Sequence, residues 1–501
     1  MKKRLLAGLI ALAMTFSLVA CKGEENPTTT PQNNPGVEGQ EPGGDGTEGV
    51  EPNGDPVDEG ACKACGKPEP WTGACNCVAI NAFNEKQGDR GDRTLINVYT
   101  FTHETADMLN FFLDENPDFA DEYYLQLEYN VEASAHRMAV SLAIDRKGDD
   151  GIDLFVADVD YAVEFAELGG TASIKDLGIE INESEYYPYT LDLMRVGGNI
   201  MALSHQATPG AMYYRADVAA DVFGIESEDE MQKLVSDWDG FLDAAQQIMD
   251  WAEEEDNGFK ILAGADELKR NFLNARDEAW LDGDTFNVDF DTISEFVDVT
   301  TEIMDMGGLA VKGSTQWGSD WYDGMKDGVF AYFGSTWYLH YTLRPNAEGG
   351  PSVGNWGMIP GPQEFFWGGT YWYGSKNAAA DDVKAEAVRT IIEFFCVNDD
   401  TLKAYMESTG DFPSKKAVAK ELAEEYDGND FFLYNTNHLA VFAVIAEKID
   451  VTKNVTKFDD VFNSLFDDFI NQVFADDVGM EEALDNMEEG VRERLPSVEV
   501  R

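Results

Sequence analysis

The stretch from Val329 to Pro413 constrains the fold most, because three short apolar runs in it each end at glycine, proline or aromatic residues. It reads VFAYFGSTWYLHYTLRP, WGMIPGP and WGGTYWYGSKN, and the helical pattern DDVKAEAVRTIIEFF follows. Short apolar strands that alternate with helices predict an α/β sheet. Ligands of such sheets bind in the crevice beyond the strand ends. A small-molecule site is therefore expected at these breaks.

Aromatic residues gather at the Gly-rich ends of these runs. Flat apolar rings with a few polar groups suit a neutral, polyhydroxylated ligand, whose sugar ring has an apolar C–H face. Packing in the ordinary core is the alternative for each ring taken singly. The aromatic residues in question are Trp337, Trp367, Tyr371, Trp372 and Tyr373.

Charge excludes several classes of partner. The chain has 501 residues, with 95 acids against 36 bases and a formal net charge of −59. Nucleic acid is disfavoured because its recognition needs a basic surface. A peripheral attachment to anionic lipid by charge alone is disfavoured for the same reason. Among so many acids, carboxylate pairs occur by chance, so a pair in the sequence is poor evidence for catalysis.

The N-terminus resembles a bacterial lipoprotein signal. A basic start, Lys2 to Arg4, precedes an apolar stretch that ends in Leu-Val-Ala-Cys21. Residues 1–20 are expected to be removed, and acyl chains on Cys21 would anchor the protein to the extracellular face of the cell membrane. A plain secretory signal is the alternative. Residues 21–60 are acidic and rich in Pro and Gly, which predicts an extended linker.

Residues 61–80 form a small cysteine-rich motif. Four cysteines within sixteen positions can supply a tetrahedral structural Zn site, and two disulfides are the other reading in an exported protein. A closed site with four cysteine ligands leaves no open position, so neither reading is catalytic. The residues are Cys62, Cys65, Cys75 and Cys77.

Polar residues follow two predicted strands of the main body. His103 and Glu104 come after the apolar run 94–101, and Asp160 follows the run 153–158. At strand ends these groups could hydrogen-bond a ligand, although helix capping or exposure in a loop is the alternative. Trp280, in a predicted loop before Gly283, completes the candidate binding residues.

The order of these motifs resembles that of the extracellular solute-binding proteins of bacterial ABC importers, in the sugar-binding group that includes maltose-binding protein. The resemblance covers about residues 93–495. Its marks include DLFVADVDYAVEFAELGG, GGNIMALSHQATPGAMYYRADV, MKDGVFAYFGSTW, WGMIPGP and STGDFPSKKAV. It implies an α/β fold of two lobes joined by a hinge. Lobe 1 would comprise residues 93–204 plus 334–398, and lobe 2 residues 205–333 plus 399–495.

The resemblance also implies a function and a site. Trp337 matches a tryptophan that stacks on a sugar ring in maltose-type relatives, and Asp160 matches an acid that bonds sugar hydroxyls. Trp372 matches a residue facing the cleft. A non-enzymatic protein that delivers a mono- or oligosaccharide to an ABC permease is implied. A secreted glycoside hydrolase and a surface scaffold or adhesin are the alternatives.

Overall fold

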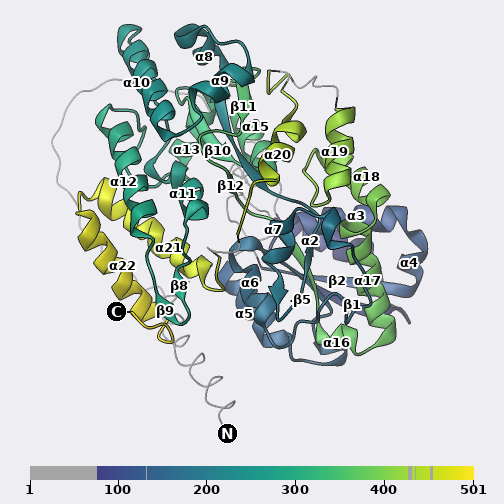
Figure 1. Cartoon of the computed structure of the whole chain (residues 1–501). Coiled ribbons are helices and arrows are strands. Elements are labelled where there is room, and N and C mark those ends of the chain that lie inside the picture. Colours follow the sequence, from purple (N-terminus) through teal and green to yellow (C-terminus); the bar gives the residue numbers. More distant parts are fainter. Residues whose placement is uncertain (1–75, 131–132, 427–430, 435, 452–454, 501) are drawn as a thin grey trace, which may run out of the picture. The chain divides into compact units, whose positions relative to one another are not determined.

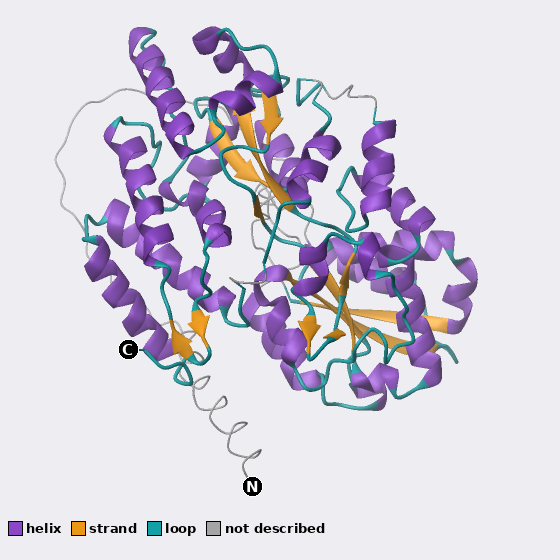
Figure 2. Ribbon diagram, viewed as in Figure 1, coloured by secondary structure: helices purple, strands orange, loops and turns teal. Residues whose placement is uncertain are grey.

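The structure is a computed structural model that describes residues 76–130, 133–426, 431–434, 436–451 and 455–500 (Figure 1). The described residues all belong to one compact unit. Its described part contains two main β-sheets, each flanked by helices (Figure 2). We call the part built around the five-stranded sheet lobe 1 and the part built around the four-stranded sheet lobe 2.

The sheet of lobe 1 has the strand order β2-β1-β3-β13-β6. Strand β1 runs parallel to β2 and β3, whereas β13 is antiparallel to β3 and to β6. Every residue of β13 is buried, and β3 is buried except at its last residue. Near-continuous apolar runs are typical of strands covered on both faces. The bounds are β1 Thr94–Thr100, β2 Tyr123–Tyr129, β3 Leu154–Asp158, β6 Leu203–Ser204 and β13 Thr370–Gly374.

Helices of lobe 1 begin close to the ends of these strands. Helix α3 spans Glu104–Glu115, and its apolar residues Met108, Leu109 and Phe112, at helical spacing, are buried. Cys396, at the end of α17, is buried as its apolar surroundings predict. The other helices that concern the site are α5 (Ala133–Ala143), α6 (Val159–Glu167), α17 (Asp382–Cys396) and α18 (Asp399–Thr409).

The sheet of lobe 2 is antiparallel and centred on one fully buried strand. Strand β7 pairs with β10 and β11, and its first two residues pair with β12. The strands are β7 Pro209–Arg215, β10 Ala331–Gly334, β11 Trp356–Ile359 and β12 Phe365–Phe366. The helices used below are α10 (Trp238–Glu254), α11 (Lys269–Ala275), α12 (Phe290–Asp305), α13 (Ser319–Lys326), α19 (Lys416–Glu425), α21 (Asp459–Ile470) and α22 (Met480–Arg494).

The chain passes between the two sheets in short connections. It leaves lobe 1 after β6 and enters lobe 2 at β7, with residues 205–208 between them. It returns from β12 to β13 through Trp367, Gly368 and Gly369. Both glycines have positive φ values, 80° and 123°, which L-residues rarely adopt. The return crossing therefore depends on this glycine pair.

Two boundaries expected from the sequence need correction. Residues 334–366 were assigned to lobe 1, but β11 and β12 pair with β7 and belong to lobe 2. Residues from 399 onward were assigned to lobe 2, but in α18 the Tyr405 ring packs against Phe111 and Phe395 of lobe 1. Strand pairing and ring packing join segments distant in sequence, so local patterns did not reveal either crossing.

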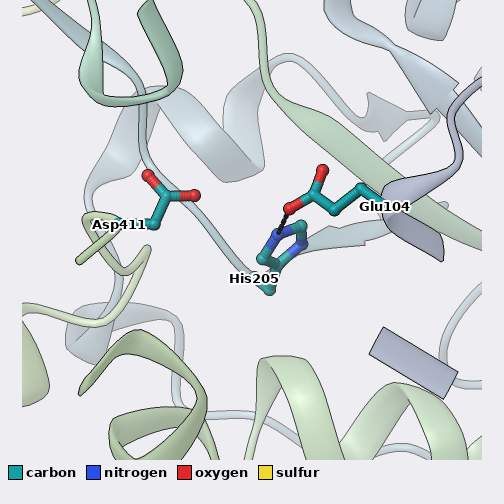
Figure 3. Close-up of side chains that lie close together, drawn as sticks. All are labelled: Glu104, His205 and Asp411. Atoms are coloured by element: carbon teal, nitrogen blue, oxygen red, sulfur yellow. Dashed lines mark ion pairs between the residues drawn. The ribbon is translucent and has the colours of Figure 1, made fainter. Parts of the chain in front are cut away.

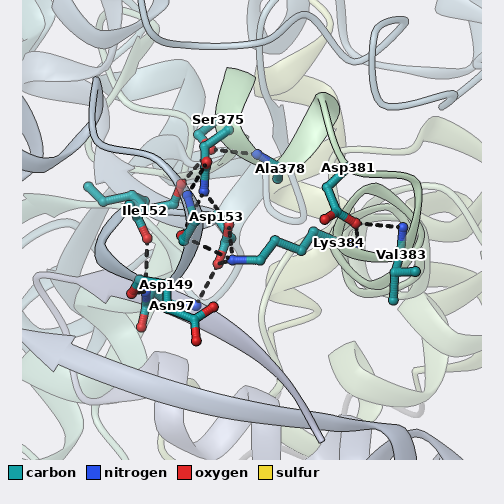
Figure 4. A network of polar contacts seen from close by, with 12 residues as sticks. Asn97, Asp149, Ile152, Asp153, Ser375, Ala378, Asp381, Val383 and Lys384 are labelled. Carbon is teal, nitrogen blue, oxygen red and sulfur yellow. Dashed lines mark hydrogen bonds and ion pairs between the residues drawn. The ribbon is translucent and has the colours of Figure 1, made fainter.

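A buried ion pair ties α17 to the start of β3 (Figure 4). Lys384 Nζ lies 2.9 and 3.0 Å from the two carboxylate oxygens of Asp153, which is fully buried. Asp153 also accepts the backbone N–H of Asn97 and the side-chain amide of Asn377. A buried carboxylate is tolerated only with such partners. The network fixes the base of the strand that carries Asp158 at its other end.

An N-terminal helix covers the edge of the lobe 1 sheet. In α2 (Asn76–Lys86), Ile80 and Phe83 are buried, and the Asn84 amide bonds to both the N–H and the C=O of Leu127. This pairing satisfies backbone groups that an edge strand would otherwise expose. Cys77 falls at the start of α2, and Cys21, Cys62, Cys65 and Cys75 lie outside the described residues. In the described part, no helix has both the length and the apolar character needed to span a membrane.

Candidate functional site

A bidentate ion pair joins the lobes at the carboxyl end of β3. Asp160 lies in the first turn of α6, and Arg270 lies near the start of α11. The two guanidinium Nη atoms donate to the two Asp160 oxygens at 2.8 and 2.7 Å. Paired bonds of this kind are strong and fix orientation. Asp160 is therefore placed between the lobes, where the sequence predicted a ligand-binding acid.

A pocket lies beside this pair and draws residues from both lobes. Phe366, at the return crossing, provides an apolar surface, while carboxylate, guanidinium and amide groups provide hydrogen-bonding partners. A few convergent polar groups beside an apolar wall resemble the lining of small-molecule sites, but the cavity of about 20 Å³ has room for only about one water molecule while the lobes are in contact. The lining residues are Val159, Asp160, Arg270, Leu273, Asn274, Arg276, Phe366, Val455, Asp459 and Asn463.

Burial shapes the charges around the pocket. Burial and the neighbouring Asp160 charge raise the pKa of Asp158 to about 7. Burial opposes ionisation of Asp160 too, but the Arg270 charge outweighs it and the pKa of Asp160 is lowered. Burial lowers the pKa of Arg276 to about 10 and raises that of Asp459 to about 6. The ionised Asp160–Arg270 pair thus lies near two carboxyl groups, those of Asp158 and Asp459, whose raised pKa values favour the uncharged form.

Further ion pairs connect lobe 1 to α21 and the loop before it. Arg137 contacts Glu164 of α6 and Asp460 of α21, each at 2.6 Å. Lys457, just before α21, lies 3.3 Å from Glu167. Together with the Asp160–Arg270 pair, these contacts hold the lobes against each other around the pocket.

Three tryptophan rings lie next to one another beside Arg270. The Trp337 indole N–H donates to the C=O of Trp367 at 2.8 Å, and the two rings meet edge to face at 5.0 Å. The Arg270 guanidinium lies over the Trp367 ring at 5.5 Å. Trp317 stacks on Trp337 with an interplanar angle of 11°. Trp337 and Trp367 thus lie beside Arg270 without lining the pocket, and their binding of a ligand stays a prediction. Trp317, which packs against both, was not among the predicted residues.

Trp280 does not belong to the site, and its prediction is corrected. It is fully buried inside lobe 2, with the Phe286 ring stacked on it at 6.0 Å and Phe462 at 5.7 Å. Arg276 lies over the same ring at 4.2 Å. The sequence placed Trp280 in a loop, but the rings of α21 cover that loop.

Two of the predicted aromatic residues lie in strand β13 and belong to the buried core. Tyr371 is buried, and Trp372 is fully buried with its ring stacked on Phe395 at 5.4 Å. The Trp372 indole N–H donates to Nδ1 of His205 at 3.2 Å. Both side chains are enclosed by the lobe 1 sheet and its helices, so their expected role as open ligand plates is corrected.

A second polar cluster lies at the crossing between the lobes (Figure 3). It contains Glu104 from α3, His205 from the first crossing and Asp411 after α18, with ligand-type atoms within 4.8 Å of one another. Burial disfavours charge on Glu104, but the neighbouring His205 and a hydrogen bond from the Tyr405 hydroxyl lower its pKa. Burial raises the pKa of Asp411 to about 7. His103, which precedes α3, makes no side-chain capping bond to it.

The tautomer of His205 argues against a cation in this cluster. Because Nδ1 accepts the Trp372 indole N–H, the proton of the neutral imidazole lies on Nε2, which faces Glu104 at 3.9 Å. A metal bound at Nε2 would move that proton to Nδ1, against the indole N–H. The geometry favours a hydrogen-bonded hinge cluster over a metal centre.

Several residues of the site escaped sequence reasoning. Arg270, Asn274 and Asn463 line the pocket, and Trp317 joins the aromatic group. The run LKRN around Arg270 places two adjacent bases in a chain with a net charge of −59, which is a weak signal. Nothing local indicates that Arg270 reaches a partner 110 positions away.

Two lobes with short crossings and a polar pocket between them define a clamp-type binding protein. Over residues 129–429 the sequence matches the family model described as bacterial extracellular solute-binding protein. The match covers more than half of the chain, which belongs to this family. The family acts outside the cell by binding solutes, and it is not enzymatic. A comparison with curated proteins found no match.

Solved structures with the same fold are numerous, and three illustrate the likeness. A protein described as extracellular solute-binding protein family 1 has a TM-score of 0.65, at 14% identity over 81% of this chain and 99% of its own. The ABC-transporter-associated binding protein of B. animalis subsp. lactis, solved with β-1,6-galactobiose, has a TM-score of 0.61, at 18% identity over 82% and 100%. The sugar-binding protein MalE of Xanthomonas citri has a TM-score of 0.59, at 17% identity over 80% and 97%. These likenesses confirm the predicted two-lobed α/β fold.

Proposed function

We propose that this protein captures a carbohydrate between its lobes and presents it to an ABC permease. The observation that carries the proposal is the pocket at Asp160 and Arg270, which adjoins the Trp337 and Trp367 rings. Carboxylate and guanidinium groups bond sugar hydroxyls, and indole rings pack on the C–H faces of sugar rings. Proteins of the same fold bind β-1,6-galactobiose and lacto-N-biose, which supports a sugar ligand here.

The decisive experiment is a thermal-shift screen of the purified protein against a carbohydrate library. A ligand that binds only the folded state raises the melting temperature as its concentration exceeds the dissociation constant. A sugar hit followed by loss of binding in Trp337→Ala, with partial retention in Trp337→Phe, supports the proposal. A peptide or ion hit with no sugar hit would contradict it.

The same samples separate binding from hydrolysis. A glycoside hydrolase needs two carboxylates flanking the bond that breaks. We expect the sugar that binds to be recovered intact after prolonged incubation, as judged by chromatography. Release of smaller sugars by the wild type, abolished in Asp160→Asn, would favour an enzyme instead.

We also propose that Cys21 carries the lipid anchor and that residues 21–60 act as its tether. The support is the sequence around Cys21 and the extracellular character of the family. In a bacterial host that processes lipoproteins, the wild type should fractionate with membranes, and Cys21→Ala should not. Release of the wild type into the medium without acyl chains, as seen by mass spectrometry, would overturn the anchor.

A structural zinc ion in the cysteine-rich motif is a separate proposal, supported by the spacing of its four cysteines. Metal analysis of the mature protein should find about one zinc per chain, and a chelator with a thiol reagent should release it. Thiols that appear only after a reductant is added would show two disulfides instead.

A further inference from the structure

Three acids on one face of α6 take part in the ion pairs that join the lobes. Asp160, Glu164 and Glu167 follow one another at intervals of four and three residues, so their side chains share one face of the helix. Asp160 pairs with Arg270 of α11, and Glu167 pairs with Lys457, just before α21. Helix α6 of lobe 1 therefore presents an acidic face to cations of lobe 2.

The third acid, Glu164, holds a cation that reaches across to lobe 2. Arg137 of α5 lies 2.6 Å from Glu164 through Nη2 and 2.6 Å from Asp460 of α21 through Nη1. Glu164 thus fixes the guanidinium with one nitrogen directed at the other lobe. Burial and the nearby Asp460 charge raise the pKa of Glu164, although Arg137 opposes both effects. Without Arg137, the two carboxylates would repel each other between the lobes.

The conformation that these pairs stabilise is too tight for a sugar. The cavity between the lobes measures about 20 Å³, which is room for about one water molecule. Asp160 and Arg270, the groups expected to bond sugar hydroxyls, bond each other instead. A sugar can therefore enter only after the lobes have separated and this pair has broken.

The other two interlobe pairs are open to water and lie outside the pocket. The Arg137 and Asp460 side chains are 21% and 34% exposed, and those of Lys457 and Glu167 are 42% and 46% exposed. None of these four residues lines the pocket. Exposed ion pairs are individually weak and are screened by salt. These pairs can therefore break and re-form without a sugar, and they can be altered without touching the pocket.

We propose that these two pairs, Arg137 with Asp460 and Lys457 with Glu167, are an ionic latch that keeps the sugar-free protein closed and limits capture to its open fraction. The limit on capture rests on the proposed function, whereas the latch itself does not. The apparent dissociation constant is the intrinsic constant divided by the fraction of molecules able to bind. Weakening the latch should therefore tighten sugar binding, although it removes contacts from the protein.

The first measurement needs no sugar. Small-angle X-ray scattering of the purified protein compares the wild type with Arg137→Met, Asp460→Asn and Lys457→Met. Each variant breaks one pair of the latch, so the sugar-free protein should open more often and its radius of gyration should increase. Arg137→Met should give the largest increase, because it leaves the Glu164 and Asp460 carboxylates facing each other. Asp460→Asn and Lys457→Met keep the test decisive if Arg137→Met fails to fold.

The matched controls remove the same kinds of cation from pairs within a single helix. Arg492→Met breaks the pair with Glu488 in α22, and Lys420→Met breaks the pair with Glu424 in α19. Both controls should have the wild-type radius of gyration. Raising the salt concentration from about 0.01 M to about 1 M shortens the screening length from about 30 Å to about 3 Å. The difference between the wild type and Arg137→Met should shrink accordingly.

The second measurement is calorimetric titration with β-1,6-galactobiose and lacto-N-biose. Arg137→Met should bind the sugar that the wild type binds about fivefold more tightly, the effect expected for the loss of one partly buried ion pair. Lys457→Met should give a smaller gain, because its pair is more exposed. Arg492→Met and Lys420→Met should keep the wild-type affinity. Circular dichroism of each variant checks that it is folded.

The outcomes separate the latch from the proposed function. Equal radii of gyration in the wild type, the latch variants and the controls would overturn the latch, whatever the sugars do. Expansion of the latch variants with unchanged or weaker sugar binding would overturn the limit on capture. If neither disaccharide binds and the carbohydrate screen gives no hit, the proposed function fails, and the scattering measurement still decides the latch.

Discussion

The Arg270 guanidinium donates hydrogen bonds to both oxygens of the Asp160 carboxylate and so joins α11 of lobe 2 to α6 of lobe 1. The side chains are only 13% and 26% exposed. Asp160 is also the acid that the sequence predicted to bond a sugar. The same carboxylate can therefore stabilise contact between the lobes and take part in binding.

Arg270→Ala should destabilise the protein strongly. The variant leaves the largely buried Asp160 charge without its partner, which typically costs about 3–5 kcal/mol. Chemical denaturation of the sugar-free protein measures this loss. The double variant Arg270→Ala with Asp160→Ala should lose much less stability than the sum of the losses in the two single variants. The reason is that removing Asp160 also removes the unpaired charge.

The matched control is Arg492→Ala. Arg492 pairs with Glu488 on the surface of α22, with side chains 50% and 31% exposed. Its loss should cost at most about 0.5 kcal/mol. Equal effects of Arg270→Ala and Arg492→Ala would contradict the importance of the interlobe pair.

The hinge cluster should make stability depend on pH. The pKa of Asp411 is raised from 3.8 to about 7 by burial, so the folded state binds its proton more tightly than the unfolded state. Stability should therefore fall as pH rises from about 4 to 7, by up to roughly 4 kcal/mol from this group. Asp411→Asn, which mimics the neutral acid, should remove that part of the slope.

The measurement is the free energy of unfolding of the wild type and of Asp411→Asn across this pH range. Other buried acids contribute slopes of their own, so the informative quantity is the difference between the two proteins. Asp243→Asn, at an exposed position of α10, serves as control. A difference that stays constant with pH would exclude the proposed titration of Asp411.

Lys384→Met should destabilise lobe 1. The change leaves the Asp153 carboxylate, which is fully buried, with only amide donors, at a cost of about 3 kcal/mol. Lys420→Met is the control, since Lys420 pairs with Glu424 on the surface of α19 and is 76% exposed. Its effect should stay below about 1 kcal/mol. Denaturation curves of Lys384→Met and Lys420→Met measure the two losses of stability. Similar midpoints for the two variants would contradict a stabilising role of the buried Lys384–Asp153 pair.

Trp280→Phe should affect stability but not sugar binding. Its ring fills a site among Phe286, Phe462 and Arg276, so a smaller ring leaves a gap that costs about 1–3 kcal/mol. Calorimetry with the best sugar should give the wild-type affinity. Weaker sugar binding by a fully folded Trp280→Phe variant would contradict the exclusion of Trp280 from the site.

Local patterns revealed the order of the elements. The strand at 94–100 and the helix from Glu104 appear as alternation and helical spacing of apolar residues. Strand ends and glycine breaks, which mark the rim of an α/β sheet, singled out Asp160, Trp337 and Trp367. Asp160 lines the interlobe pocket and Trp367 lies under Arg270 with Trp337 against it, while their binding of a ligand stays a prediction. Such local patterns can be read from the sequence without knowing which distant segments are in contact.

The orientation of the other aromatics could not be read in this way. Trp372 and Trp367 come from the same aromatic run, yet β-strand register turns the first into the core against Phe395 and leaves the second beside Arg270. Strand β11 joined lobe 2 only because it pairs with β7, more than a hundred positions earlier. Register and pairing are decided by contacts between distant segments.

By itself the sequence determined an α/β class through its apolar periodicity and an acidic chain unsuited to nucleic acid through its composition, because both are properties of short segments. The family and the two lobes were implied by the resemblance of its motif order to that of the solute-binding proteins. Only the tertiary structure decided that Arg270 pairs with Asp160, that Trp280 is core and that Trp317 stacks on Trp337. Those outcomes depend on which distant surfaces bury each other, and the free energy of that burial is a property of the assembled fold.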